Sequence, residues 1–308
     1  MQQSLKRTFS QIKGSKQFIG PDLKLVVLPE YFLTSFPFGE SLSEWKEKAC
    51  ISIEDDLFQQ MKQFCVQQEI FLSGNFYETD TNFPELYFQS SFIIDDQGEI
   101  ILKYRRLNSM FAPTPHDVLD DYIKIYGTES LFPVVNTKLG KLACIASEEI
   151  LYPEVARCLM MHGAEVFLHS SSEVGSPQLT HKEIAKRARA IENMSYVISA
   201  NSAGIVGIDI PSSSTDGISK IIHFEGQVLS EASTGESMVA NNYIDIAALR
   251  DYRSKVSMQN YNARQRFELY APFYKLYTHY PSNSFKNEKP SKELFIKTQL
   301  KVIKKLKS

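Results

Sequence analysis

The sequence predicts an α/β protein with mixed β-sheets. Short apolar runs alternate with amphipathic helical segments over most of the 308 residues, as expected when helices connect parallel strands. Two tight turns, Asp-Asp-Gln-Gly at 95–98 and Phe-Glu-Gly at 224–226, instead join neighbouring apolar runs into antiparallel hairpins. The first 280 residues contain no internal repeat and no linker, so one domain over residues 1–281 is the simplest arrangement.

The individual elements follow from apolar spacing and from the residues at their ends. Leu57, Met61 and Phe64 recur at helical spacing, and Gly163 ends a second expected helix. The expected helices are residues 54–68, 154–162 and 182–194. The expected strands are residues 23–28, 70–76, 90–94, 99–104, 141–146, 164–169, 196–201, 218–223, 227–232 and 239–244.

Composition excludes several classes of protein. The net charge of −2 provides no global field that would attract nucleic acid or anionic lipid. No apolar run approaches the roughly 20 residues that span a bilayer, and the polar residues 1–16 lack a signal-peptide core. The four cysteines form no CxxC pair and no dense framework, which favours a reducing compartment. We therefore expect a cytoplasmic protein without a membrane span or a nucleic-acid partner.

Residues 282–308 form a basic C-terminal tail. They contain eight lysines and two glutamates, a surplus of +6, so the first 281 residues carry −8. Phe295, Val302 and Leu306 fall on one face of a helix. Such a segment is either a solvated tail or a basic amphipathic helix that binds an acidic partner or a membrane surface.

Three segments place reactive side chains directly after expected strands, where α/β proteins commonly form sites. Glu30 would act as a general base if apolar neighbours bury it, and otherwise it lies in a loop or caps a helix. The cations within residues 102–106 would stabilise an oxyanion, or they are simply exposed at a strand end. Ser147 stands on a sharp turn that would expose a nucleophile, or its hydroxyl satisfies the turn.

These segments, in this order and spacing, resemble the nitrilase superfamily of carbon–nitrogen hydrolases. Pro-Glu-Tyr at 29–31 matches the motif of the family glutamate, and Tyr-Arg-Arg at 104–106 aligns with the motif of its lysine. Ser147 takes the place of the family cysteine, seven residues before Glu154 of a Tyr-Pro-Glu motif. Further matches, within a resemblance from about residue 4 to residue 270, are Arg157, residues 163–165, residues 189–193, Asn201 and residues 217–219.

The resemblance implies a four-layer α-β-β-α sandwich with two mixed β-sheets, often assembled as a homodimer or higher homo-oligomer through outer helices. It also implies that Glu30 is the base, Ser147 the nucleophile and Arg106 the cation beside the oxyanion. No metal or organic cofactor is implied, because the sequence has no cluster of metal ligands and no phosphate-binding loop. The residues expected to bind substrate are Tyr31, His116, Glu148, Glu149 and His169.

The sequence departs from the family pattern at several positions. Ser147 replaces cysteine, Arg106 replaces lysine, and a second glutamate expected about eight residues after the lysine is absent from residues 112–117. Lys103 would supply an ammonium only if the strand register shifted. The family usually has a strand before its first helix, whereas here Met1 leads directly into what looks like that helix. Either the sequence omits this strand or the protein lacks it, and a missing strand would leave an unpaired sheet edge. Several changes in one site favour natural divergence over a single engineered substitution.

A serine nucleophile needs more help from a base than a cysteine does. A cysteine thiol is partly ionised at neutral pH, whereas a serine hydroxyl usually relies on an adjacent histidine, here His116 or His169. We therefore expect a hydrolase of a small amide, carbamoyl or nitrile compound that uses Glu30, Arg106 and Ser147. The alternative is an inactive protein that binds a small polar ligand or a protein partner on the same fold. A scaffold tethered by the tail is a third alternative.

Overall fold

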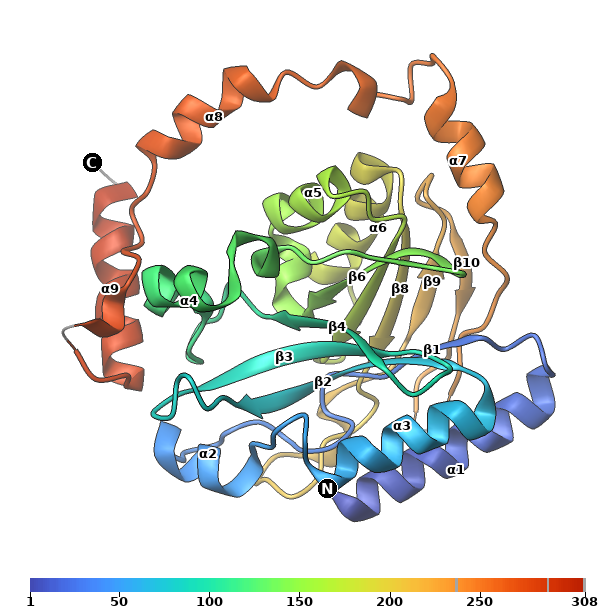
Figure 1. The fold of residues 1–308 in the computed structure, drawn as a ribbon, viewed down its shortest axis with the longest axis horizontal. Coiled ribbons are helices and arrows are strands. Elements are labelled where there is room, and N and C mark those ends of the chain that lie inside the picture. The colour runs from blue at the N-terminus through green and yellow to red at the C-terminus, as the bar shows by residue number, and fades with distance from the viewer. Residues whose placement is uncertain (236–237, 287, 307–308) are drawn as a thin grey trace.

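The computed structural model describes residues 1–235, 238–286 and 288–306. Two stacked β-sheets lie between outer helices (Figure 1). Helices α1 (Gln2–Ile19) and α3 (Asp56–Gln68) cover one sheet, and α5 (Pro153–Met161) and α6 (His181–Asn193) cover the other. This arrangement confirms the predicted four-layer α-β-β-α sandwich with two mixed sheets.

The first sheet contains, in spatial order, β1 (Leu25–Val27), β2 (Phe71–Thr79), β3 (Tyr87–Ile94) and β4 (Ile100–Arg105). β1 pairs in parallel with β2, and the other neighbours pair antiparallel. The turn predicted at residues 95–98 joins β3 to β4, where the Asp95 carboxylate accepts the backbone amides of Gln97 and Glu99 at 3.0 and 2.8 Å. This hairpin is therefore confirmed.

The second sheet contains, in spatial order, β10 (Val228–Glu231), β9 (Lys220–Ile222), β8 (Tyr196–Asn201), β7 (Val166–Ser171), β6 (Gly140–Ala146) and β5 (Val135–Thr137). β6, β7 and β8 are parallel, because α5 and α6 carry the chain back between them. β9 and β10 form the second predicted hairpin.

The remaining helices surround this sandwich. They are α2 (Leu42–Ala49), α4 (Leu119–Tyr126), α7 (Ile246–Ser254), α8 (Phe267–Leu276) and α9 (Lys292–Leu306). From α7 onward the chain runs as an outer arc past α5 and α6 and ends in α9 near α4 (Figure 1). No helix among the described residues is long and apolar enough to cross a membrane.

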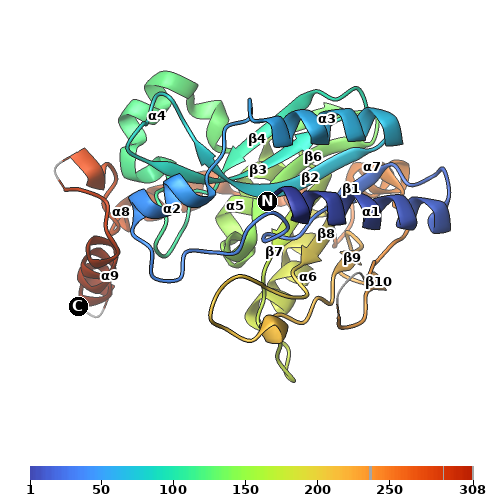
Figure 2. The ribbon, with the colours of Figure 1, turned by 90° about the horizontal axis from the view of Figure 1, so that it is seen from below.

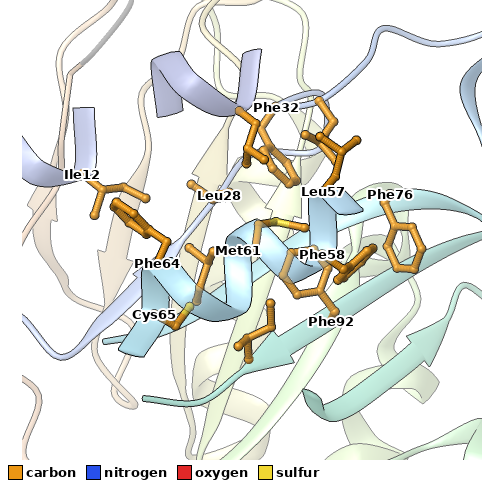
Figure 3. Close-up of a cluster of buried hydrophobic side chains, with 14 of the residues drawn as sticks. Ile12, Leu28, Phe32, Leu57, Phe58, Met61, Phe64, Cys65, Phe76 and Phe92 are labelled. Atoms are coloured by element: carbon orange, nitrogen blue, oxygen red, sulfur yellow. The ribbon is translucent and has the colours of Figure 1, made fainter. Parts of the chain in front are cut away.

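Apolar side chains fill the interfaces between the layers. Figure 3 shows the cluster under α3, where Phe58 packs edge to face against Phe76 and Phe92 at centroid distances of 4.8 and 5.2 Å. α1 lies side by side with α3 (Figure 2), and Phe9 stacks on Phe64 at 4.0 Å. Two further clusters lie between the sheets and beneath α5 and α6. Burial on these faces fixes how the sheets stack.

The strands that precede the candidate residues, β1, β4 and β6, have their carboxyl ends on one side of the sandwich, which we call the common edge. β1 and β4 run in the same direction, because two antiparallel steps separate β4 from β2. The sheets are joined at this edge: Ser170 Oγ donates to the Leu28 carbonyl at 2.8 Å, and the Glu30 amide donates to the Ser171 carbonyl at 3.2 Å. α6 also begins here, because it follows β7 and leads back to the start of β8.

A cavity of about 1230 Å³ lies next to β1, which is an edge strand. Residues from α1, from β1 and from the segment 238–246 line it. The strand predicted at residues 239–244 is wrong, because this segment forms no strand. Asn242 Nδ2 donates to the Leu229 carbonyl of β10 at 2.9 Å, but none of the described strands forms a backbone ladder with this segment.

The basic tail packs against the body of the protein through part of its length. Gln299 Nε2 of α9 donates to the Met110 carbonyl at 3.0 Å, and within the tail the buried Phe295 ring lies 5.8 Å from that of Phe285. Ser284 Oγ donates to Asp117 at 2.8 Å, close to the start of α4. Leu306 is exposed, although the sequence places it on the same helical face as Phe295.

Candidate active site

Ser147 lies in a strained turn directly after β6. Its φ of 45° is in the left-handed region, which residues with a β-carbon rarely adopt. The residue begins the 3₁₀ helix η3 (Ser147–Leu151), and 4% of its surface is exposed. His169 supports the turn, because its Nε2 lies 2.8 Å from the Ser147 carbonyl while its Nδ1 lies 2.9 Å from Ser199 Oγ. Ser147 therefore occupies a sharp turn between a strand and a helix, and its role as a nucleophile stays a prediction.

Glu30 follows β1, and its carboxylate is buried at the same edge. Gln89 Nε2 donates to Oε1 at 2.6 Å, and Ser172 Oγ donates to Oε2 at 2.5 Å. Because Ser172 follows β7, the carboxylate links the two sheets. Within the part of the chain that the structure describes, no hydrogen bond joins Glu30 to Ser147.

Arg106 follows β4 and carries a buried positive charge. Its Nη1 donates to Gln89 and lies 3.7 Å from Glu30 Oε1, and its Nη2 pairs with Glu148. Burial alone would lower the pKa of Arg106, but the neighbouring carboxylates, Glu148 first, outweigh burial and raise it. The guanidinium therefore stays charged between two carboxylates.

The other cations of this segment are engaged elsewhere. Lys103 Nζ lies 2.6 Å from Glu78 Oε1, and Arg105 Nη2 lies 2.6 Å from the same oxygen and also pairs with Asp80. The alternation of side chains along β4 thus separates Lys103 and Arg105 from Arg106. Lys103 does not take the place of the family lysine.

Glu149 organises the loop that follows β4. Its Oε1 accepts the amides of Leu107 and Asn108 at 2.8 and 2.9 Å, and its Oε2 accepts the Tyr104 hydroxyl at 2.6 Å. Burial raises the pKa of Glu149, although Arg106 and these donors oppose the shift. The substrate-binding role predicted for Glu149 and for Glu148 stays a prediction.

Tyr31 and the two candidate histidines occupy different surroundings. Tyr31 lines the cavity next to β1, and burial raises its pKa. His169 is fully buried, which holds its pKa well below the ordinary value, and burial also lowers the pKa of His116. Among the described residues, neither imidazole contacts the Ser147 hydroxyl, so the adjacent histidine of a typical serine nucleophile is not supplied. Roles for all three in substrate binding remain predictions.

Sequence reasoning missed Lys182, which lies in the first turn of α6. Its Nζ lies 3.3 Å from Ser147 Oγ and donates to the Ser172 carbonyl at 3.0 Å. The Thr180 hydroxyl caps the helix by accepting the Glu183 amide. A helix that follows a strand presents its first turn at the strand end, so a lysine at the start of the predicted helix 182–194 was the available signal.

The chain belongs to the carbon–nitrogen hydrolase family. The model of the family described as "Carbon-nitrogen hydrolase" matches residues 3–254, which is most of the chain. The match covers both sheets and includes Glu30, Arg106 and Ser147.

Known proteins are similar to this chain in sequence or in fold. A formamidase from Bacillus thuringiensis (strain Al Hakam) is 30% identical over 212 residues, covering 67% of this chain and 58% of the formamidase. The chain thus spans little more than half the length of that relative. Saccharomyces cerevisiae Nit3, a member of branch 10 of the nitrilase superfamily, is 21% identical with a TM-score of 0.66, covering 83% of this chain and 89% of Nit3.

The NitN amidase from Neterenkonia sp. AN1 is a further structural relative. It is 20% identical with a TM-score of 0.62, and the match covers 88% of this chain and 93% of the amidase. At such identities the two solved structures establish likeness of fold alone.

Proposed function

We propose that the protein hydrolyses a carbon–nitrogen bond of a small amide, carbamoyl or nitrile compound. Ser147 is the nucleophile, and Arg106 is the cation that stabilises the oxyanion. Glu30 is the carboxylate on which removal of the Ser147 proton depends. The observation that carries this proposal is the strained turn at Ser147, at the same edge as a buried carboxylate and a buried guanidinium. A fixed cation stabilises developing negative charge most strongly where water is excluded.

The cysteine nearest in sequence is a poorer candidate than Ser147. Cys144 lies within β6, fully buried in the core between the sheets, and its Sγ is 3.7 Å from Ser73 Oγ. Burial raises the pKa of its thiol to about 12, which disfavours the thiolate. Ser147, in contrast, lies at the end of the strand, on the same side of the sandwich as the charged groups of Glu30 and Arg106.

The names of the relatives support short amides as substrates. The formamidase and the amidase are named for amide hydrolysis. Formamide and other short aliphatic amides are therefore the first compounds to test, with nitriles and carbamoyl compounds as the comparison set.

Assays of the native protein and of Ser147→Ala on these compounds test the proposal. We expect the substitution to lower kcat/KM by about 10³-fold or more, because it removes the attacking atom. Ser171→Ala is a matched control, since Ser171 ends the neighbouring strand and its hydroxyl has no hydrogen-bond partner among the described residues. Equal turnover by the native and Ser147→Ala proteins would exclude Ser147 as the nucleophile.

Ser147→Cys provides a complementary test. A thiol ionises far more readily than a hydroxyl, so a site that retains the family's electrostatics should accept it. We expect turnover of short amides to persist or to rise in this variant, and its loss would contradict nucleophilic attack from position 147.

A second candidate function is binding without catalysis. Ser147, Glu30 and Arg106 are exposed by only 4%, 5% and 8%, and the ion pair between Arg106 and Glu148 lies among them. A closed site of this kind suits a protein that retains a small polar ligand. Saturable binding of amides by calorimetry, with no product formed over many hours, would favour this function over hydrolysis.

A further inference from the structure

A serine nucleophile requires a group that removes the hydroxyl proton as the new bond forms. The Glu30 carboxylate is held by Gln89 and Ser172, and His169 contacts the Ser147 carbonyl instead of its hydroxyl. Of the described side chains, Lys182 is the one that hydrogen-bonds to the Ser147 hydroxyl, at 3.3 Å. The amine is therefore within the reach that proton transfer requires once the contact tightens in a substrate complex.

The position of Lys182 is set by more than its own side chain. The residue lies in the first turn of α6, which Thr180 caps, and the Thr180 hydroxyl also donates to Glu173 in the segment that follows β7. Its Nζ also donates to the Ser172 carbonyl at 3.0 Å, and Ser172 in turn donates to Glu30. Serine, lysine and carboxylate are thus joined through one short loop after β7.

We propose that Lys182 is the general base of the reaction, forming a serine–lysine dyad with Ser147. This inference rests on the hydrolase function proposed above and names the residue that activates its nucleophile. Glu30 then acts through charge: it stabilises the ammonium that Lys182 becomes. The lysine of the site is supplied by α6, while Arg106 occupies the end of β4.

The electrostatics of the site are compatible with this role. Burial lowers the pKa of Lys182 from its ordinary value of 10.5, and the positive charge of Arg106 acts in the same direction. The carboxylates Glu30, Glu173 and Glu148 oppose the shift without reversing it. A larger fraction of Lys182 is consequently the neutral amine at neutral pH than for a lysine in water.

The chemical steps balance in protons and electron pairs. The Ser147 oxygen attacks the amide carbon, its proton passes to the neutral Lys182 amine, and the carbonyl electron pair moves to oxygen beside Arg106. The carbon–nitrogen bond then breaks, and the leaving nitrogen takes the proton from the Lys182 ammonium. Water attacks the resulting ester, Lys182 accepts its proton, and the Ser147 oxygen leaves and recovers that proton. The net change is an amide and water converted to a carboxylic acid and an amine.

The first experiment measures nucleophilicity without any amide substrate. A fluorophosphonate probe labels an activated serine hydroxyl, and mass spectrometry locates the label. We expect labelling of native protein at Ser147, at a rate that rises with pH, with a midpoint below the ordinary lysine value of 10.5. Lys182→Met should reduce this rate by about 10²- to 10⁴-fold, the usual contribution of a general base.

Chemical rescue separates catalysis from a structural role of Lys182. In Lys182→Ala, added primary alkylamines should restore labelling at Ser147, and at equal concentrations of the neutral amine the restored rate should increase with the basicity of the amine. Lys182→Arg keeps the charge and the length but should not restore the rate, because arginine does not give up its proton. A residue that only holds the Ser172 carbonyl would show neither dependence. Arg187→Met is the control, since Arg187 is exposed on the same helix.

The outcomes distinguish the dyad from the wider function. Labelling of Lys182→Met at the native rate and with the native pH profile would overturn the dyad, even if native protein hydrolyses amides. Failure of native protein to label at Ser147 would also overturn it. If native protein labels in a Lys182-dependent manner but turns over no carbon–nitrogen substrate, the dyad stands and the proposed hydrolase function fails. Thermal unfolding of each variant verifies that the comparison concerns folded protein.

Discussion

Cations at neighbouring positions in and just after β4 contact different partners. Lys103 and Arg105 extend from one face of β4 to Glu78, whereas Arg106 reaches the candidate site. Arg105 and Glu78 are both almost fully buried, so each charge is compensated by the other instead of by water. An intact buried pair adds little net stability, but removal of one member leaves an uncompensated buried charge, which is strongly destabilising.

Glu78→Gln should lower the free energy of unfolding by about 3–5 kcal/mol, because it leaves the buried Arg105 charge without its main partner. Urea unfolding at neutral pH measures the difference. Glu47→Gln is the control, because Glu47 is exposed on α2. A loss of stability no larger than that of the control would contradict the assigned role of Glu78.

The same pair predicts a pH dependence of stability. Burial alone would raise the pKa of Glu78, but Arg105 and Lys103 outweigh it and lower the pKa below the ordinary 4.5. The ion pair therefore contributes fully above pH 4.5, and this contribution is lost as the pH falls toward the lowered value. The stability difference between native protein and Glu78→Gln should shrink over that acidic range, and a difference independent of pH would contradict this account.

The elements were predictable where their signals are local. The strand expected at residues 196–201 is β8 with the same bounds, and the helix expected at 182–194 is α6 shifted by one residue. The strand expected at residues 239–244 is wrong. An apolar run becomes a strand only when a neighbouring strand accepts and donates its backbone hydrogen bonds, and this segment pairs with none of the described strands. Helix α9 shows the opposite case. The sequence also allowed this segment to be a solvated tail, but in the structure Phe295 is buried.

Packing of the tail makes a prediction about α9. Phe295→Ala should lower the free energy of unfolding by about 3–5 kcal/mol if the tail unfolds together with the domain, because it leaves a cavity where the buried Phe295 ring was. Leu300→Ala is the matched control, since 54% of Leu300 is exposed in the same helix. Hydrogen exchange of residues 292–306 provides the second measurement. Fast exchange of α9 in native protein, with no effect of Phe295→Ala, would favour a solvated tail.

At the scale of the whole molecule, the exposed aromatic residues of α8 bear on assembly. No residue of this helix is buried, and Leu269, Tyr270 and Phe273 are all exposed. Exposed apolar patches of this kind commonly mark protein interfaces. We therefore propose that the protein forms a homodimer or a higher homo-oligomer with α8 in the contact.

Light scattering after gel filtration tests this assembly. Native protein should elute with at least twice the mass of one chain, and Leu269→Lys combined with Phe273→Lys should shift it toward the monomer, because two charges would be buried unpaired. Phe18→Lys is the control, since Phe18 is an exposed aromatic residue on α1. A monomeric native protein, or an oligomer unaffected by the α8 substitutions, would remove α8 from the interface.

The sequence by itself determined the class of fold, the main strands and helices, and the segments that carry Glu30, Arg106 and Ser147. These follow from apolar periodicity, turn residues and motif spacing, all of which act over short stretches of chain. Only the tertiary structure decided which side chains meet. Lys182 reaches Ser147 because α6 begins beside β6 and β7, and His169 does not reach the hydroxyl because it is buried against the backbone of the turn. Such contacts depend on how two sheets stack and where a helix returns, which no local pattern encodes.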